Sequence, residues 1–446
     1  MLCKLKPALF LFIALFAMIS LHLASELADA QILVPIRPFN PIRLGGVFTM
    51  GLAESGGLMQ PSALLGTQLS NENLKWIGDN CDAAAFSPNC LHPGIFQSVM
   101  QQHPLFTPLL YLYATSISEK PDQEGSVGGW NSSLAPKILL DTNRKEMPYP
   151  SPDGHWMDFG SRTWAELWRK RAAILTQRYG VQGVVAAELP VNNTFLPEKP
   201  EKYPDFNSLA SATEKWLQIV HNPNRYLLVA AAIQFGQISN HPTLAAPPGG
   251  NEPGLSGLLW DQYYPFMDGA WYEGWVRPYW TGLPVSANEW ERQLEAADRA
   301  ALNGQVFIAN AAYHNRAELE YALASYLLVS HKQGRLVIQP MPLRKGLRDD
   351  AGFSLAVMRR EVSRYSSYFN IPLGSPHQSR HLIAAHGGSV WRRAFDYGVV
   401  YVNADNYRTV QIALGAPMVH PDGEKVSDVT LPPHSGAILL YNTPGG

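Results

Sequence analysis

Short apolar runs alternate with amphipathic stretches along the chain from Gly45 to about Pro342. Short apolar runs between polar or glycine-rich segments are typical of buried parallel strands, and stretches with a period near 3.6 residues are typical of helices. Eight such runs occur, which is the number of strands in a closed (β/α)8 barrel. The predicted strands are Gly46–Met50, Leu74–Ile77, Phe106–Tyr113, Gly183–Glu188, Tyr226–Phe235, Phe266–Glu273, Val306–Ala311 and Leu336–Gln339.

Helix-start signals precede three of the amphipathic stretches. Thr163, Ser286 and Asn315 each stand three residues before a glutamate, the spacing of an N-terminal cap and its partner in the first turn. A fourth helix is predicted over 209–220. The later strands follow one another at about 40 residues, which suits right-handed crossovers that wind into a barrel. An open doubly wound sheet is the alternative, but no Gly-x-Gly-x-x-Gly turn follows any predicted strand.

The C-terminal part has a different pattern. A last helix is predicted over 353–368, and the segment 372–376, with Pro at both ends, has the composition of a linker. Short runs of alternating polarity then predict a small all-β sandwich. We therefore expect a (β/α)8 TIM barrel over 45–372 and a C-terminal β-sandwich over 378–446. The predicted strands of the sandwich are Trp391–Phe395, Val399–Asn403, Thr409–Leu414 and Ala437–Tyr441.

The N-terminal thirty residues have the pattern of a signal peptide. Lys4 and Lys6 precede the uncharged apolar stretch 7–21, and Ala28-Asp29-Ala30 has the small residues of a cleavage site. Cleavage after residue 30 predicts an exported chain, periplasmic or extracellular. An uncleaved membrane anchor is the alternative, although an apolar run of about fifteen residues is shorter than the roughly twenty that span a bilayer. No membrane span is expected in the mature chain.

The cysteines and the charge indicate the redox state of the chain and the kinds of partner that it could bind. Cys3 lies in the predicted leader, so Cys81 and Cys90 remain, and in an exported chain such a pair predicts a disulfide. Two buried thiols are the alternative. Charged residues make up 16% of the chain and the net charge is −2, without a Lys/Arg-rich block, so we expect no nucleic-acid partner. No metal or cofactor motif occurs in the sequence.

Two of the predicted strands end in a carboxylate. Glu188 closes the fourth predicted strand and Glu273 closes the sixth. In a barrel both side chains would lie at the C-terminal face, and most glycosidases cleave the glycosidic bond with two opposed carboxylates. Glu273 shares its face of the strand with Trp271, whereas Ala187, not Glu188, occupies the equivalent inward position on the fourth strand. A helix cap or an ion-pair partner is the alternative for each acid.

Other polar and aromatic residues fall near the same predicted strand ends. Amides there can bind sugar hydroxyls or satisfy loop backbone, and aromatic rings can stack on sugars or pack in the core. Asp158 precedes a helix and is a candidate for the site or for a cap, while Asp268 begins its strand and favours a turn. The candidate substrate-binding residues are Asp158, Gln234, Trp271, Tyr272, Trp275, Asn310 and Gln339.

Several of these segments resemble a known family. The motifs Met157-Asp158-Phe159-Gly160, 183–188 and 267–273, with the C-terminal segments 391–403 and 431–436, are similar to glycosyl-hydrolase-like barrels related to the α-galactosidase superfamily. The resemblance implies a (β/α)8 glycosidase whose fourth-strand acid is the nucleophile and whose sixth-strand acid donates the proton. The chain departs from the family at Gln182 and Ala187, where the family has two aspartates.

The expected function is hydrolysis of O-glycosidic bonds in a poly- or oligosaccharide. Glu188 would serve as nucleophile or base and Glu273 as general acid. A non-catalytic carbohydrate-binding barrel is the first alternative, and a structural envelope protein is the second. The sequence leaves open the glycan, the retaining or inverting course of the reaction and the oligomeric state.

Overall fold

The computed structural model describes most of the chain after residue 41. The predicted signal peptide, over 1–30, lies outside the described residues. The described residues are 42–48, 69–118, 134, 138–140, 143–146, 154–187, 189, 200–231, 263–272, 274–279, 281–331, 335–343 and 354–442.

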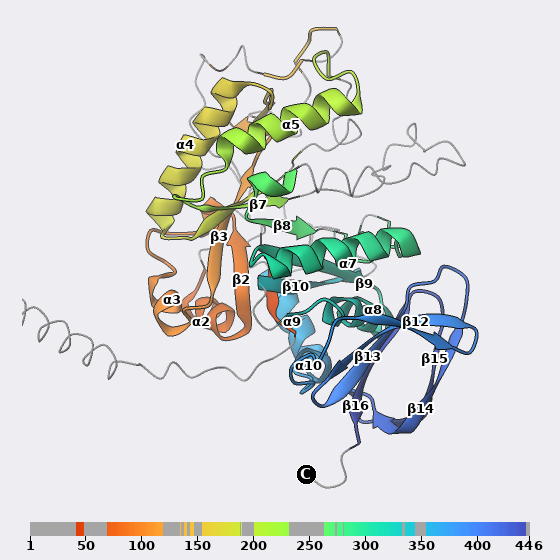
Figure 1. Ribbon diagram of the computed structural model, residues 1–446. Helices are drawn as coiled ribbons and strands as arrows, with labels where there is room; N and C mark the ends of the chain where they lie inside the picture. The colour runs from red at the N-terminus through yellow and green to blue at the C-terminus, as the bar shows by residue number, and fades with distance from the viewer. Residues whose placement is uncertain are drawn as a thin grey trace, which may run out of the picture. The chain divides into compact units, whose positions relative to one another are not determined.

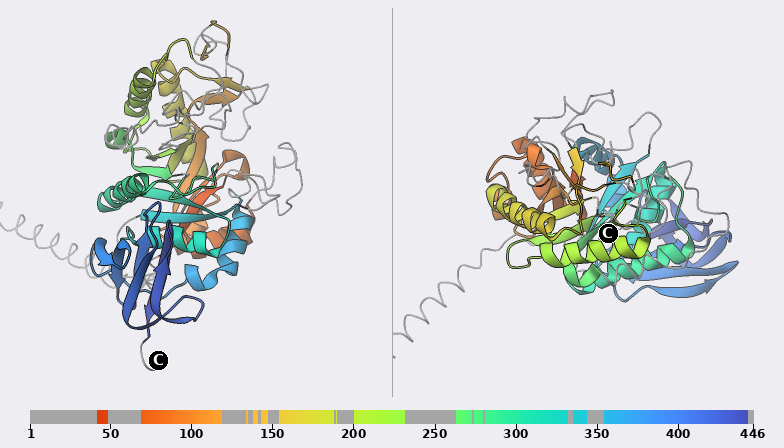
Figure 2. Two further views of the ribbon diagram at one scale, coloured as in Figure 1. Left: turned by 90° about the vertical axis from the view of Figure 1, so that its right-hand side faces the viewer. Right: turned by 90° about the horizontal axis from the view of Figure 1, so that it is seen from above.

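Eight parallel strands close into a barrel, as the sequence predicts (Figure 1). The first strand pairs with both the second and the last, so the sheet has no free edge. Helices lie outside the strands (Figure 2). In chain order the barrel strands are β1 (Leu44–Phe48), β2 (Cys81–Phe86), β3 (Thr107–Tyr113), β6 (Gly183–Ala187), β7 (Leu227–Ala231), β8 (Gly269–Tyr272), β9 (Val306–Tyr313) and β10 (Arg335–Pro342).

The second predicted strand is wrong. The segment 74–77 lies inside helix α2 (Asn71–Asn80), whose N-terminus is capped by the Ser70 side chain. Leu74 and Ile77 are buried on one helical face, at the i, i+3 spacing that their short apolar run concealed. The true strand, β2, has the sequence CDAAAF. Because three alanines have little intrinsic strand preference, its local sequence gave no signal.

The predicted helix starts agree closely with the structure. Ser286 caps α7 (Ala287–Leu302) and Asn315 caps α8 (Arg316–Leu327). The helix predicted at Thr163 is α4 (Arg162–Tyr179), capped two residues earlier by Ser161. The remaining helices of the described residues are α3 (Gln97–Gln102), α5 (Phe206–Val220), α9 (Leu355–Arg364) and α10 (Ser366–Phe369), with short 3-10 turns η2 (Pro88–Cys90) and η5 (Tyr264–Phe266).

The barrel has two apolar layers because its strands are buried on both faces. Small and branched side chains such as Ala85, Val185 and Ile308 fill the interior. Larger side chains, among them Phe307 and Trp275, pack between the strands and the surrounding helices. Glycine at the start of β6 and β8 allows the strands to approach closely, since a Cβ at Gly269 would stand 2.2 Å from the carbonyl oxygen of Val306.

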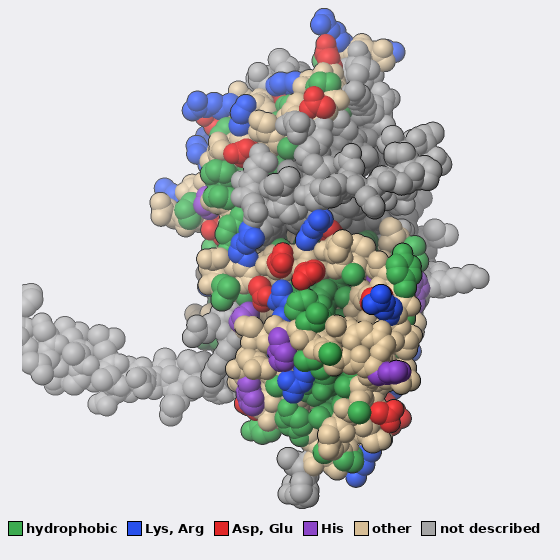
Figure 3. Space-filling view, turned by 45° about the vertical axis from the view of Figure 1, so that its right-hand side comes forward, with side chains coloured by type: hydrophobic (Ala, Val, Ile, Leu, Met, Phe, Trp, Pro, Cys, Tyr) green, Lys and Arg blue, Asp and Glu red, His purple; other side chains and the backbone are tan. Residues whose placement is uncertain are grey.

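A separate antiparallel sheet follows the barrel and confirms the predicted all-β region. Alternate residues of β13 face two cores: Val399 and Tyr401 join the sheet's own core, while Val400 and Val402 join the core that surrounds the barrel. Histidine side chains are scattered over this part of the surface (Figure 3). In spatial order the strands are β11 (His381–Ala385), β12 (Gly388–Phe395), β13 (Gly398–Asn403), β16 (Ser435–Tyr441), β14 (Val410–Val419) and β15 (Lys425–Leu431).

The expected disulfide between Cys81 and Cys90 is not formed, and both residues are buried thiols. Cys81 is the first residue of β2, and Cys90 ends η2 beyond the other end of that strand. A strand advances about 3.3 Å per residue, so the length of β2 separates the Cα atoms of the two cysteines. This separation is far larger than the roughly 7 Å that a disulfide allows. The thiol alternative is the correct one.

In the described parts of the chain, none of the helices combines the length and the apolar character that a bilayer crossing requires.

Candidate functional site

The C-terminal face of the barrel is where βα loops assemble a site in this architecture. The two predicted catalytic acids, Glu188 and Glu273, lie outside the described residues, as does Gln234. The described residues that surround the same strand ends include Trp271, Asn310 and Gln339.

The predicted strand parity holds for the residues that can be placed. Trp271 and Ala187 both belong to the apolar interior of the barrel. The Trp271 ring meets Tyr111 edge-on, with ring centroids 5.9 Å apart. Trp271 is thus directed into the barrel, as expected of a ligand-facing position, while the last inward position of β6 is held by an alanine.

Two amide side chains stand together in the barrel interior. Asn310 of β9 and Gln339 of β10 are partners in the strand register, and neither is exposed. Both atoms of the Asn310 amide are buried and have no hydrogen-bond partner among the described residues. Leaving a buried amide unpaired costs about 1–3 kcal/mol per group. Asn310 therefore has an amide, free among the described residues, that could bind a ligand hydroxyl or a water molecule.

Tyr272 and Trp275 occupy the layer between barrel and helices rather than the interior. The Tyr272 ring stacks on Phe307 with centroids 5.8 Å apart, and its hydroxyl donates to Glu289 of α7 at 3.4 Å. Burial, reinforced by Glu289, raises the pKa of Tyr272 well above its usual value. Trp275 is fully buried and donates through Nε1 to the carbonyl of Ala322 at 3.2 Å. These contacts favour the core-packing alternative for both residues.

Asp158 links two loops on this face. It follows β5 (Gly154–Trp156) and precedes α4, and its Oδ2 pairs with Lys202 Nζ at 2.6 Å. Its Oδ1 accepts from the Gly160 N–H at 3.1 Å and from the Tyr203 hydroxyl. Burial, with the Asp158 carboxylate second, raises the pKa of Tyr203 well above its ordinary range. Asp158 thus fastens the loop after β3 to the loop after β6, a positioning role.

Asp268 lies at the opposite, N-terminal end of the barrel, where side chains contribute to stability rather than to chemistry in this fold. Its backbone N–H donates to the Leu228 carbonyl at 2.7 Å, and its Oδ2 accepts from the Leu228 N–H at 2.9 Å. The carboxylate fixes the start of β7 beside β8, which is the turn role that the sequence favours.

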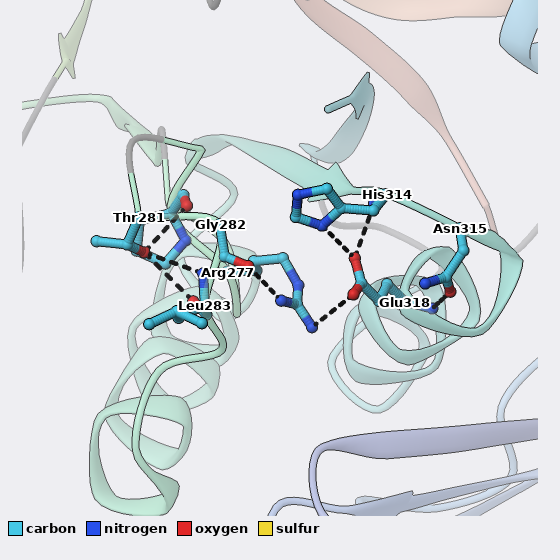
Figure 4. A network of polar contacts seen from close by, with 8 residues as sticks. Arg277, Thr281, Gly282, Leu283, His314, Asn315 and Glu318 are labelled. Atoms are coloured by element: carbon cyan, nitrogen blue, oxygen red, sulfur yellow. Dashed lines mark hydrogen bonds and ion pairs between the residues drawn. The ribbon is translucent and has the colours of Figure 1, made fainter. Parts of the chain in front are cut away.

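A charged network lies beyond β8 and β9 (Figure 4). The sequence places His314 near the mouth of the barrel, but the contacts of Glu318 with His314 and Arg277 were missed. Glu318, in the first turn of α8, lies between Arg277 and His314. Its Oε1 is 3.5 Å from Arg277 Nη2, and its Oε2 is 2.9 Å from His314 Nδ1. The same Oε2 accepts from the His314 backbone N–H at 2.7 Å. Arg277 also donates to the Gly282 carbonyl at 2.5 Å.

The loop after β8 is held in a demanding backbone conformation beside this network. Val276 has φ of 52°, a left-handed conformation that is unfavourable for a β-branched residue. Its N–H donates to Gln293 Oε1 at 2.8 Å, which helps to fix it. Such a conformation persists only where the surrounding structure holds it, and residues of this kind cluster at functional sites. Gly282, also with positive φ, leaves room for the His314 ring, which would stand 3.1 Å from a Cβ there.

The network orients the imidazole of His314. Because Nδ1 faces the Glu318 carboxylate, it carries the proton in the neutral ring, and Nε2 is then an acceptor. About half of the His314 side chain is exposed, whereas Arg277 is buried and burial lowers its pKa. The only sequence signal was the Asn315-x-x-Glu318 spacing, which indicates a helix cap and says nothing about the residue before it.

Within the described ranges, no group of three or more His, Cys, Asp or Glu side chains could hold a metal ion.

Comparison of the sequence with protein-family models gives no match, and comparison with curated proteins gives none either. Solved structures with a similar fold include the glycoside hydrolase domain of PelA from Pseudomonas aeruginosa, with 14% identity over 67% of this chain and 95% of that domain and a TM-score of 0.39. A maltogenic alpha-amylase, AmyB from Thermotoga neapolitana, has 12% identity over 90% and 99%, with a TM-score of 0.45. An alpha-amylase from Lactobacillus plantarum has 12% identity over 90% and 99%, with a TM-score of 0.43.

Proposed function

We propose that the protein is an exported glycoside hydrolase that cleaves O-glycosidic bonds in a poly- or oligosaccharide. One observation carries the proposal. β6 and β8 are the fourth and sixth strands of a closed barrel, and in the sequence each is followed at once by a glutamate, Glu188 and Glu273. Only β7 separates these strands, so their backbones stand about 10 Å apart, a span that two glutamate side chains can close to a catalytic separation.

The proposed mechanism assigns one role to each acid. Glu273 protonates the leaving oxygen, and Glu188 either attacks the anomeric carbon or activates a water molecule. Asn310 and Gln339 would bind sugar hydroxyls from the barrel interior, and Trp271 would form the apolar floor of the site. The oriented Nε2 of His314 adds a hydrogen-bond acceptor at the rim. Export is supported by the signal-peptide pattern over 1–30 alone.

A non-catalytic carbohydrate-binding barrel is the second candidate. Its support is Ala187, which occupies the last inward position of β6, where the family that the sequence resembles has a carboxylate. A barrel without an effective acid on that strand would keep the amides and aromatic rings of the interior and bind sugars without cleaving them.

The test is a screen of poly- and oligosaccharides for reducing-sugar release, with binding measured in parallel. We expect Glu273→Gln and Glu188→Gln each to lower kcat at least about 100-fold, the usual loss for removal of a general acid or base, while binding persists. Glu291→Gln, an exposed glutamate on α7, is the control and should keep full activity. Binding without hydrolysis by the unaltered protein would favour the second candidate. Full activity in both site variants would rule out this acid pair.

A further inference from the structure

A polar groove lies on the outside of the barrel, away from the candidate active site. It has a volume of about 660 Å³ and is formed by the second half of α4 and the turn between α5 and β7. Its lining includes Val181, just before β6, and Arg225, just before β7. Both positions precede their strands, so the groove belongs to the N-terminal end of the barrel, opposite the face where the βα loops meet.

Positive charge converges on this groove from two elements. Arg169 and Lys170 project from α4, and Arg225 projects from the turn after α5. All three are exposed, and none of them forms an ion pair with a carboxylate of the described residues. No Asp or Glu lines the groove. An anion that enters it would therefore meet three cations and no carboxylate in the groove lining.

The walls of the groove are fixed before any ligand arrives. Arg169 Nη1 donates to the Ile219 carbonyl at 3.2 Å and joins α4 to the end of α5. Trp168 of α4 and Trp216 of α5 also meet edge-on, with ring centroids 4.9 Å apart. The Arg225 N–H donates to the Asn222 carbonyl at 2.9 Å, which closes the turn. Such preorganisation reduces the entropy lost when a ligand binds.

The other lining residues indicate what kind of anion fits. The amides of Gln177, Asn222 and Asn224 can donate to and accept from hydroxyl groups, and Ile174, 45% exposed, adds an apolar edge. No aromatic ring lines the groove, so it lacks the stacking surface that binds nucleobases or neutral sugar rings face-on. One exposed apolar side chain is too little for insertion into a membrane.

We propose that this groove is a second, non-catalytic binding site for an anionic oligosaccharide, a chain of sugars that carry carboxylate groups. Arg169, Lys170 and Arg225 bind the carboxylates, and the amides bind the ring hydroxyls. The site does not depend on hydrolysis at the other face of the barrel. A polymer held here would leave the C-terminal face open.

The experiment measures binding of purified oligogalacturonate to the full-length protein by calorimetry, with maltohexaose as the uncharged probe. We expect binding of the oligogalacturonate alone, weakened by added NaCl because the contacts are exposed ion pairs. Arg169→Gln/Arg225→Gln should lower the affinity about fivefold or more. Arg162→Gln/Arg178→Gln removes two exposed cations of the same helix that do not line the groove, and should leave the affinity within about twofold.

Three results would overturn the proposal. The first is absence of oligogalacturonate binding by the unaltered protein. The second is an equal loss of affinity in both double variants, which would indicate diffuse surface charge. The third is binding of duplex DNA or of phosphatidylglycerol vesicles that depends on Arg169 and Arg225 while oligogalacturonate fails to bind. Because the readout is binding, none of these results depends on whether the protein is a hydrolase.

Discussion

The Arg393 guanidinium of β12 lies 2.8 Å from the carbonyl oxygen of Ser330, just beyond the end of α8. The same Nη1 also donates to the carbonyls of Leu327 and Leu328, at 3.0 and 2.9 Å. Carbonyls at a helix C-terminus have no partner within the helix, and a cation there also interacts favourably with the helix dipole. Arg393 is 3% exposed, and burial lowers its pKa to about 10. One side chain of the C-terminal sheet thus caps the C-terminus of helix α8 of the barrel.

Replacing Arg393 should therefore be costly for stability. We expect Arg393→Met to lower the free energy of unfolding by about 3 kcal/mol, because several buried carbonyls lose their donor. Urea denaturation would measure the change. Arg392→Met, at the neighbouring half-buried position, should stay within about 0.5 kcal/mol. Equal losses in the two variants would show that this contact does not carry the stability.

The glycine that begins β8 should not tolerate a side chain. A Cβ at Gly269 would stand 2.2 Å from a backbone oxygen of β9, and backbone cannot move aside as a flexible side chain can. We expect Gly269→Ala to lower the unfolding free energy by about 1–3 kcal/mol or more. Gly415→Ala is the control, since nothing lies within 4 Å of a Cβ there. A thermal melt of both variants decides the matter; similar melting temperatures would contradict the close approach.

A pH dependence is expected at His420. The Glu320 carboxylate, 3.7 Å from His420 Nδ1, raises the pKa of His420 above its ordinary 6.5, assisted by Asp422 and Glu424 and opposed by burial. Arg316, paired with Asp422, also faces this cluster. Because the folded-state pKa is the higher one, the stabilisation is fully present below about pH 6.5 and is lost as the pH rises through the raised value.

His420→Gln should therefore cost more stability at pH 5.5 than at pH 9. The difference should remain below about 1 kcal/mol, because burial of His420 opposes the attraction of Glu320. Urea denaturation at the two pH values measures it, and Glu320→Gln should remove the same pH-dependent part. An identical cost of His420→Gln at both pH values would exclude the ion pair as its source.

The network around Glu318 predicts that replacing His314 changes kcat/KM without changing stability, whereas replacing Glu318 changes both. His314→Ala removes a half-exposed side chain, so the unfolding free energy should change by no more than about 0.5 kcal/mol, while kcat/KM on a cleaved glycan should fall about tenfold. Glu318→Gln leaves the buried Arg277 cation without its counter-charge and should cost about 3 kcal/mol of stability as well. A stable His314→Ala variant with unchanged kinetics would place His314 outside the site.

The two thiols predict a simple chemical result. Cys81 and Cys90 are buried, so a thiol reagent such as Ellman's should not react with them in the folded protein and should react after denaturation. Reductant should leave the melting temperature unchanged. A drop in melting temperature on reduction would instead indicate the disulfide.

The sequence predicted seven of the eight barrel strands because each is an apolar run of adequate strand preference. Three of them, β1, β6 and β8, also contain glycine where a neighbouring strand approaches closely. It predicted the helix starts at Ser286 and Asn315 because a capping side chain acts within its own first turn. It also predicted the inward direction of Trp271, since alternation along a strand is a local property. β2 escaped detection because an alanine strand is stabilised by its neighbours in the barrel.

The amino-acid sequence alone determined the alternation of strands and helices, the positions of the glycines and helix caps, and the all-β character of the C-terminal region. Short-range periodicity and backbone preference are local properties, so they determine these features without tertiary contacts. Only the tertiary structure decided that Tyr272 and Trp275 face the helices, that Cys81 and Cys90 stay apart, and that Arg277 meets Glu318. Those outcomes depend on barrel closure, which brings together residues about 40 positions apart and turns each buried side chain to one of two apolar layers. No local pattern contains that information.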